Sequence, residues 1–229
     1  MRLERTIMSV VASLLVAAGP AVAQSSTTNK VYIDQVGNTN TVTLTQSGSG
    51  NSIGVSSSDY ATITGSTNSV TMTQTGDNNK SQYKITGNTN VYTSVVTGNS
   101  NDVMITCGTS NGACTGVNIN HSIQGNSNKV VETLSGSAIT SKTKIVGGLN
   151  DLEYTLNSSN GKLDVDIAGD SNIMRHTQNG AAGVSGHELK VVLTGSLNQV
   201  TTAQAGTIDT KVDIKINGAS NIINVTTSN

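Results

Sequence analysis

Residues 35–51 read QVGNTNTVTLTQSGSGN and hold two copies of a Gly-x-x-Asn motif, Gly37/Asn40 and Gly48/Asn51. Between the two motifs, apolar or amide side chains alternate with small polar ones, a period of two that is typical of a half-buried strand. Glycine permits the positive backbone dihedral of a tight arc, and asparagine tolerates such turns. The stretch therefore predicts a strand that is bounded by two tight arcs.

The Gly-x-x-Asn motif at Gly48/Asn51 recurs along the chain, with 22 to 28 residues between successive asparagines. Its copies are Gly48/Asn51, Gly76/Asn79, Gly98/Asn101, Gly125/Asn128, Gly147/Asn150, Gly169/Asn172, Gly195/Asn198 and Gly218/Asn221. A second turn marker stands about halfway through each unit, at Gly37, Gly65, Gly87, Gly108, Gly136, Ser158, Gly180 and Gly206. A fixed period of this size is typical of stacked architectures. We therefore expect an all-β fold, a two-sheet parallel β-solenoid of about 22 residues per coil with two strands in each coil.

Stacking of the coils would align the asparagine side chains along the axis. The amide of each asparagine could then bond to the same amide in the next coil, as in the ladders of stacked strands. The predicted structural ladder consists of Asn51, Asn79, Asn101, Asn128, Asn150, Asn172, Asn198 and Asn221.

The order of the charged residues along the chain indicates whether the coils stack in register. Residues at the same distance before successive motif glycines should be cross-strand neighbours and form a column. In one such column the sign of the charge alternates: Lys142, Asp164, Lys190 and Asp213. A second column does the same: Lys162, Glu188 and Lys211. On the other outward face, Lys129 would meet Asp151, and Glu153 would meet Arg175. Because like charges opposite each other destabilise a strand pair, this order favours parallel, in-register coils over solvated charges without pairing.

The composition excludes several classes of protein. The chain has 24 Gly, no Phe and no Trp, a charged fraction of 12% and a formal net charge of -1, which gives no basic surface for nucleic acid. A hydrophobic fraction of 34% is low for a globular domain but suits the thin interior of a solenoid. Disorder is the competing interpretation of so polar a chain, and the strict two-residue alternation argues against it.

The N-terminus is typical of an export signal. Arg2 and Arg5 precede an apolar run over residues 7–18, and the small residues Ala21 and Ala23 predict cleavage before Gln24. We therefore expect a signal peptide at 1–23, a short N-terminal segment at 24–32 and the repeat solenoid at 33–229. The mature chain should be secreted, and no later stretch is a candidate membrane span.

Two cysteines, Cys107 and Cys114, lie close together in the middle of the chain. In an exported protein such a pair more often forms a local disulfide than stays reduced, and here it would staple the one irregular arc. The alternative is two buried free thiols. A zinc site is not expected, because no histidine stands at ligand spacing from the cysteines.

The opening stretch resembles the curlin repeat, Gln-x-Gly-x-x-Asn-x-Ala/Val-x-x-x-Gln, and later fragments resemble it too. The positions that carry the resemblance are Gln35, Gly37, Asn40, Gln46, Gly48, Gln74, Gly76, Gln204 and Gly206. Similarity to curlins implies a secreted amyloid subunit that forms adhesive biofilm fibres outside a Gram-negative cell. It implies self-association as a homopolymer, possible contact with a nucleating or major subunit and an outer-membrane secretion channel, and no cofactor, nucleic acid or small-molecule substrate.

The chain also departs from the curlin pattern. Aliphatic residues replace several of the glutamines, the second asparagine column stops after Asn111, and a cysteine pair is added. A divergent matrix protein and a minor nucleating or capping subunit therefore stay open beside a major subunit. The first strand, at 31–35, and the last repeat, at 221–227, carry no capping helix or proline, which favours head-to-tail stacking.

Other functions fit the sequence less well. Pectin-degrading β-helices have coils of similar size, but the charges here alternate in a pattern of mutual neutralisation. Calcium-binding repeats of the Gly-Gly-x-Gly-x-Asp kind are absent, because Asp77 and Asp170 are isolated turn aspartates. No acid–base or nucleophile constellation is present, so we do not expect an enzyme. A soluble adhesin or an ice-binding protein is the alternative, because threonines such as Thr43, Thr71 and Thr93 share an outward face. That array is short, and threonine favours strands in any case.

Overall fold

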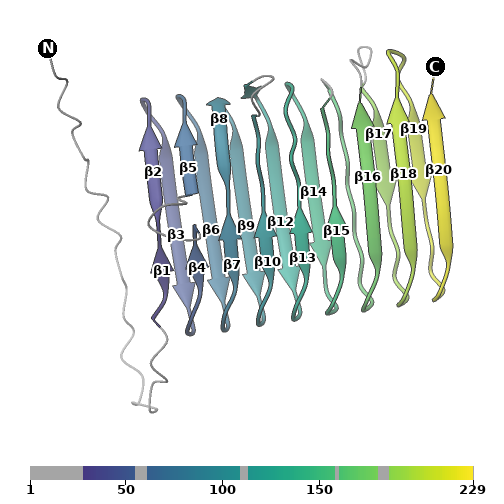
Figure 1. Cartoon of the computed structure of the whole chain (residues 1–229), viewed down its shortest axis with the longest axis horizontal. Helices are drawn as coiled ribbons and strands as arrows, with labels where there is room; N and C mark the ends of the chain where they lie inside the picture. The colour runs from purple at the N-terminus through teal and green to yellow at the C-terminus, as the bar shows by residue number, and fades with distance from the viewer. Residues whose placement is uncertain (1–27, 55–60, 109–112, 158–159, 180–185, 229) are drawn as a thin grey trace, which may run out of the picture.

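A computed structural model describes residues 28–54, 61–108, 113–157, 160–179 and 186–228. In these residues every regular element is a β-strand, and the strands lie across the long axis of a flat, two-layered rod (Figure 1). Every strand pair is parallel. The fold is thus a two-sheet parallel β-solenoid, as the repeat predicts. The proposed signal peptide lies outside the described residues.

The first sheet has nine strands, which follow one another along the rod in the order of the sequence. They are β1 (Lys30–Val31), β4 (Ser52–Ile53), β7 (Lys80–Gln82), β10 (Asp102–Met104), β13 (Lys129–Val131), β15 (Asp151–Glu153), β16 (Ile173–Asn179), β18 (Gln199–Ala205) and β20 (Ile222–Ser228). In the first four coils, the strand of the first sheet is followed by a strand of a separate four-stranded sheet. These strands are β2 (Ile33–Val36), β5 (Ala61–Thr64), β8 (Lys84–Asn88) and β11 (Cys114–Thr115).

The second sheet lies behind the first and consists of a five-stranded and a two-stranded part. Its strands are β3 (Thr41–Ser47), β6 (Ser69–Thr75), β9 (Val91–Thr97), β12 (Asn118–Gln124), β14 (Thr140–Ile145), β17 (Glu188–Val191) and β19 (Lys211–Ile214). Residues 162–167 bridge the two parts, because Val165 N–H donates to the Lys142 carbonyl at 3.0 Å and Val191 N–H donates to the Asp164 carbonyl at 3.4 Å. With this bridging layer, the second sheet has eight layers in the described residues.

The interior is a thin line of aliphatic side chains contributed by every second residue of both sheets. Representative members are Ile63, Val70, Ile119, Leu152 and Val200, all buried. The largest fully buried side chains are the tyrosines at 83, 92 and 154. A narrow core of this kind explains how a chain of low hydrophobic content can fold, since each coil has to bury only a few side chains.

The glycines of the arcs are required mainly by close approach between coils. Gly48 has a φ of 102°, which favours glycine, but Gly195 has no left-handed φ. A Cβ atom at Gly48 would overlap the carbonyl oxygen of Gly76, and one at Gly195 would overlap that of Gly218. Positive dihedrals also occur in the residue before the ladder asparagine, even at Leu149 and Leu197. Stacking therefore restricts the glycine column from Gly48 to Gly195, whereas the dihedral argument holds for only part of it.

One predicted turn marker is wrong. The residue opposite Gly87 in the next coil is Cys114, not Gly108, because the fourth coil contains inserted residues between them. The second asparagine column also ends earlier than expected: Val117 N–H donates to Asn90 Oδ1 at 3.0 Å, so a valine follows Asn90. Asn111 lies outside the described residues. The markers Ser158 and Gly180 do so as well.

Candidate self-assembly surfaces

A ladder of asparagines runs along one corner of the rod. From Asn79 onward, each ladder asparagine donates both its N–H and its Nδ2 to Oδ1 of the asparagine one coil earlier, at 2.9 to 3.1 Å. Four of the eight Nδ2 groups, those of Asn51, Asn79, Asn101 and Asn198, also reach a glycine carbonyl of the following coil, as from Asn101 to Gly125 at 2.8 Å. The structure brings all eight predicted residues into this column. Because the interior ladder amides are buried, each rung holds two coils in register.

The ladder begins one coil earlier than the sequence motif indicated. Asn51 N–H donates to Oδ1 of Asn29 at 3.0 Å, and Asn29 Nδ2 donates to the Gly48 carbonyl at 3.0 Å. Sequence reasoning missed Asn29 because Ser26 stands where the motif has glycine. The spacing of 22 residues between Asn29 and Asn51 was the available signal. Strand pairing accordingly starts at Lys30, before the boundary expected at residue 33.

A second set of side chains bonds the coils on the outside of the same arcs. Asp77 Oδ1 accepts the N–H of Ser49 at 2.7 Å, and Asn99 Oδ1 accepts the N–H of Asp77 at 2.7 Å. Asp170 Oδ1 accepts the N–H of Gly148 at 2.6 Å. Asp77 and Asp170 are therefore not isolated turn residues. They join neighbouring coils through their carboxylates.

Some of the remaining curlin-motif residues form shorter columns in the opposite corner and the interior. Asn68 donates its N–H to Oδ1 of Asn40 at 2.9 Å, and Gln46 Nε2 donates to Gln74 Oε1 at 2.8 Å. Gln204 Nε2 donates to Thr210 Oγ1 at 2.9 Å instead of to another glutamine. The others lie where the repeat puts them: Gln35 on β2, Gly37, Gly48 and Gly76 in the stacked arcs, and Gly206 after β18.

The charge column on the second sheet has the expected order. Lys142 Nζ lies 3.8 Å from Asp164 Oδ2, and Lys190 is in register with Asp213 on the neighbouring strand. In the parallel column, Glu188 lies 3.7 Å from Lys162 and 3.8 Å from Lys211. These side chains are exposed, so each pair contributes only a few tenths of a kcal/mol. Their value is specificity, because a slip by one coil would bring like charges together.

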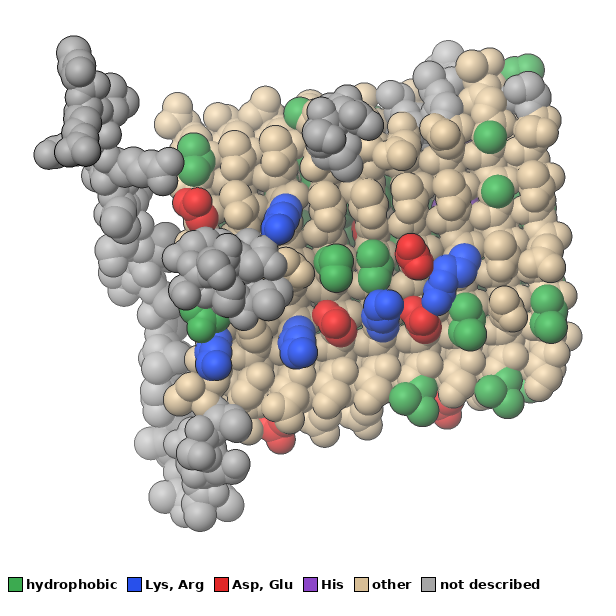
Figure 2. All heavy atoms as spheres, in the orientation of Figure 1, with side chains coloured by type: hydrophobic (Ala, Val, Ile, Leu, Met, Phe, Trp, Pro, Cys, Tyr) green, Lys and Arg blue, Asp and Glu red, His purple; other side chains and the backbone are tan. Residues whose placement is uncertain are grey.

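The first sheet carries a row of alternating charges that the sequence revealed only in part. Asp102 pairs in register with Lys80 on one side and Lys129 on the other, and Lys129 pairs with Asp151. Figure 2 shows this band of blue and red side chains across the middle of the sheet. Arg175 then closes on Asp151 with an N–O distance of 2.7 Å. The row supplies the same register control on this face.

A disulfide joins Cys107 and Cys114, with their Cα atoms 5.5 Å apart. Both cysteines are buried. The bond spans the inserted residues of the fourth coil, and Cys114 lies against Gly87 of the preceding coil. It therefore closes the insertion locally and leaves the stack on either side continuous.

Several polar side chains are buried inside the rod. Glu132 Oε1 lies 2.9 Å from His121 Nε2 and accepts a bond from Ser141 Oγ at 2.6 Å. Further along, His176 Nδ1 lies 2.8 Å from Thr202 Oγ1, and burial lowers the pKa of His176 to about 4. Burial also raises the pKa of Tyr92 far above its usual range. His121, Glu132 and His176 are enclosed, so they act as internal hydrogen-bonding units instead of as reactive surface groups.

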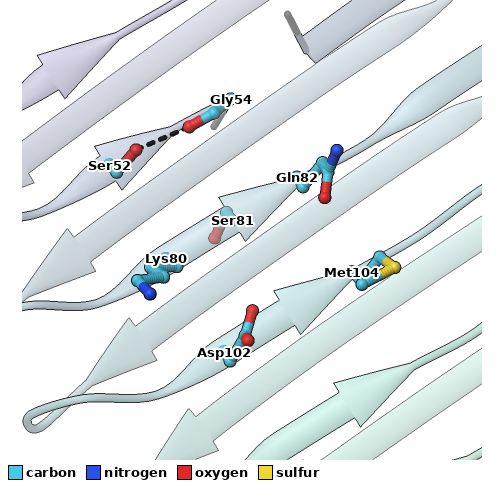
Figure 3. Close-up of a pocket in the computed structure, with 7 residues that line it drawn as sticks. All are labelled: Ser52, Gly54, Lys80, Ser81, Gln82, Asp102 and Met104. Atoms are coloured by element: carbon cyan, nitrogen blue, oxygen red, sulfur yellow. Dashed lines mark hydrogen bonds between the residues drawn. The ribbon is translucent and has the colours of Figure 1, made fainter. Parts of the chain in front are cut away.

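A depression over β4, β7 and β10 is lined by Ser52, Gly54, Lys80, Ser81, Gln82, Asp102 and Met104 (Figure 3). Its only charged side chains, Lys80 and Asp102, are cross-strand neighbours. Among the described residues no group of His, Cys, Asp or Glu could hold a metal ion. No helix long and apolar enough to cross a membrane occurs in them either.

The described rod has open strand edges at both ends. At the C-terminal end, β20 pairs with β18 on one side, and its inward Ile223 and Val225 are only partly buried. At the N-terminal end, β3 pairs with β6, and Val42 and Leu44 are partly exposed in the same way. Both ends thus present unpaired backbone groups beside apolar side chains.

Comparison with known families adds an independent observation. The model of the curlin associated repeat matches residues 22–48 and 29–58. The resemblance noted in the sequence is therefore confirmed, and the chain carries curlin repeats, which belong to a structural family. The remaining coils continue the same stack by their geometry. No curated protein and no solved structure gives a significant match.

Proposed function

We propose that this chain is a structural subunit of an extracellular, curli-like amyloid fibre that grows by stacking the end of one solenoid on the beginning of the next. The observation that supports the proposal is the C-terminal rung at which the described rod ends. Gly218 is the one member of its glycine column whose Cβ position meets no carbonyl of a following coil in the described residues. Every earlier glycine from Gly48 to Gly195 has that space filled by the next coil.

The cellular role follows from the curlin repeat. Curlin fibres lie outside the cell, so we propose secretion, assembly in the biofilm matrix or on a Gram-negative cell surface, and a role in adhesion. The partners would be further copies of the chain, a nucleating or major subunit, and an outer-membrane channel. The export signal proposed at 1–23 supports this route.

The substitution Gly218→Ala tests the stacking. In the folded chain the new methyl group would meet only Asn221 Nδ2, at 3.3 Å, so the monomer should fold with a small adjustment. In a fibre the same methyl group would collide with the arc of the incoming subunit, as it would at any interior glycine. Circular dichroism should therefore stay β-rich while seeded elongation, followed by thioflavin fluorescence, should stop or slow at least tenfold.

Gly195→Ala is the matched control. Its methyl group would overlap the Gly218 carbonyl inside one chain, so it should destabilise the monomer as well as the fibre. Equal elongation of Gly218→Ala and the unsubstituted chain would overturn the proposal that this end receives the next subunit.

Ice binding is kept as a second candidate because of one observation. On the outward face of the second sheet, Thr43, Thr71 and Thr93 are direct neighbours in register, with Thr45 and Thr73 beside them. The array ends at β12, where Asn120 follows Thr93. Thermal hysteresis of the monomer would support this candidate, and its absence together with fibre growth would exclude it.

A further inference from the structure

The described rod contains half a coil more than a whole number of coils. The first sheet has nine strands and the second has eight layers. At the C-terminal end, β20 therefore projects one layer beyond β19. We call these two free edges, at residues 222–228 and 211–216, the C-terminal step.

The step cannot be matched by simple translation of the next subunit. If its β1 and β2 were laid on β20, its β3 would stand two layers from β19, and one strand position in the second sheet would stay empty. An empty position leaves backbone groups unpaired on both sides. A half-turn about the rod axis removes the gap, because it exchanges the two sheets.

We propose that successive subunits of the fibre are related by a half-turn about the rod axis, so that β3 of the incoming copy pairs with β20 and its β1–β2 layer pairs with β19. This inference rests on the proposed function as a stacking subunit. The strands of the two sheets run in opposite directions across the rod (Figure 1), so the half-turn keeps both new pairs parallel. It also keeps inward residues inward.

The first new pair fits in length and side chains. Strands β3 and β20 each have seven residues with the same alternation of exposure. In register, Val42 of the incoming copy would cover Ile223 and Leu44 would cover Val225, all four partly buried at the free ends. Gln46 would come beside Thr227, whose hydroxyl is buried without a hydrogen-bond partner in the single chain. The amide of Gln46 can supply that partner.

The second new pair is also complementary. Val31 would lie over Val212 and Ile33 over Ile214, which continues the apolar interior. On the outward face, Asp34 would lie beside Lys215. Under translation without rotation, Asp34 would instead meet the neutral Thr226.

The half-turn creates one like-charged pair, Lys30 beside Lys211. Lys211 already lies 3.8 Å from Glu188 in its own chain, and both lysines would be exposed at the joint. Solvent and this carboxylate moderate the repulsion.

The corner of the incoming coil suits the step as well. Asn40 holds the first place in its column and already accepts Asn68 N–H at Oδ1. After the half-turn its N–H and Nδ2 would face Oδ1 of Asn221, in the arrangement that joins every interior rung. The first coil has an asparagine at both corners, Asn29 and Asn40. Either corner could therefore dock on Asn221, with or without the half-turn. The number of strands in the two sheets favours the half-turn.

A charge exchange tests the inference on the full mature chain. Asp34→Lys should slow seeded elongation several-fold because it would face Lys215, and Lys215→Asp should do the same by facing Asp34. The double variant Asp34→Lys/Lys215→Asp should restore the rate, with the monomer's melting temperature measured for each variant as the control for folding. Failure of the double variant to recover would overturn the half-turn, because unrotated subunits do not bring these residues together.

Cross-linking gives a second, structural readout. A chain with Asn224→Cys and Thr43→Cys should form covalent oligomers in fibres with a short bismaleimide, because the half-turn makes these residues neighbours. A chain with Asn224→Cys and Tyr32→Cys should not. Oligomers from the second pair alone would overturn the half-turn and leave the fibre intact as a proposal. If the unsubstituted chain forms no fibres, the proposed function itself fails.

Discussion

Asn221 donates its N–H and Nδ2 to Oδ1 of Asn198 at 3.0 and 2.9 Å, the same two-point contact that joins the interior rungs. Within the described residues, however, Oδ1 of Asn221 accepts no hydrogen bond. Its Nδ2 turns to the Ala219 carbonyl at 3.3 Å, whereas Nδ2 of Asn198 reaches Gly218 in the following coil at 3.0 Å. Asn221 therefore binds the preceding coil as an interior ladder asparagine does, while its Oδ1 is free to accept hydrogen bonds from a following coil.

Removing an interior rung should cost far more than removing this last one. Asn128→Ala would take away the acceptor for the N–H and Nδ2 of Asn150 and leave both donors buried. We expect a loss of about 3 kcal/mol in the free energy of unfolding. The matched variant Asn221→Ala should cost less than about 1 kcal/mol, because that side chain is exposed. Chemical denaturation of the monomers measures both, and equal losses would contradict the ladder as a source of stability.

The charge column should control register in a salt-dependent way. Lys190→Glu would place three carboxylates in succession, with the new one between Asp164 and Asp213. Assembly should weaken more at low salt than at high salt, since salt screens exposed charges. Adding Asp164→Lys and Asp213→Lys should restore the assembly rate. Identical kinetics of Lys190→Glu and the unsubstituted chain at every salt concentration would count against electrostatic register control.

Acid should destabilise the rod through His176. Burial is the main cause that lowers its pKa from 6.5 to about 4, and nearby His187 adds to it. Above pH 6.5 the imidazole is neutral in both states. Between pH 6.5 and 4 the unfolded chain binds a proton that the folded chain does not. Stability should therefore fall through this window by about 3 kcal/mol.

The variant His176→Gln isolates that contribution from the carboxylates, which also titrate in acid. Unfolding free energies of both chains, measured every half pH unit, should converge as the pH falls, because only the unsubstituted chain loses the histidine contribution. Parallel curves would show that His176 is not the group responsible.

The disulfide should matter locally. Cys107 and Cys114 are separated by 7 positions, so the bond closes a short loop in the unfolded chain, and its loss should cost about 2 kcal/mol. Replacing both residues by serine should lower the melting temperature while fibres still form. Loss of all β-structure in that double variant would mean that the whole stack depends on the disulfide.

The sequence predicted the fold because the repeat itself encodes the geometry. The two-residue alternation and the Gly-x-x-Asn cadence determine which side chains face inward, and even the acidic Glu132 is buried. The partner of Glu132 was not predictable, since His121 lies on the opposite sheet and follows from the strand arrangement.

Insertions and substitutions within the motif set the limit of prediction. Gly108 fitted the cadence, but the inserted residues move Cys114 into its place. Asn29 was missed because its motif lacks glycine, and the role of Asp77 was missed because its partner is a backbone N–H of another coil. The strand count, which decides how subunits can meet, depends on where pairing begins and so required the structure.

Seeded elongation of the mature chain shows whether the chain is a fibre subunit. Monomer of residues 24–229 is incubated with and without sonicated seeds, and the products are followed by thioflavin fluorescence and imaged by negative-stain electron microscopy. We expect unbranched fibres that grow from the seeds without a lag, with strands about 4.8 Å apart along the fibre axis. A chain that stays monomeric in analytical ultracentrifugation under all of these conditions would contradict it.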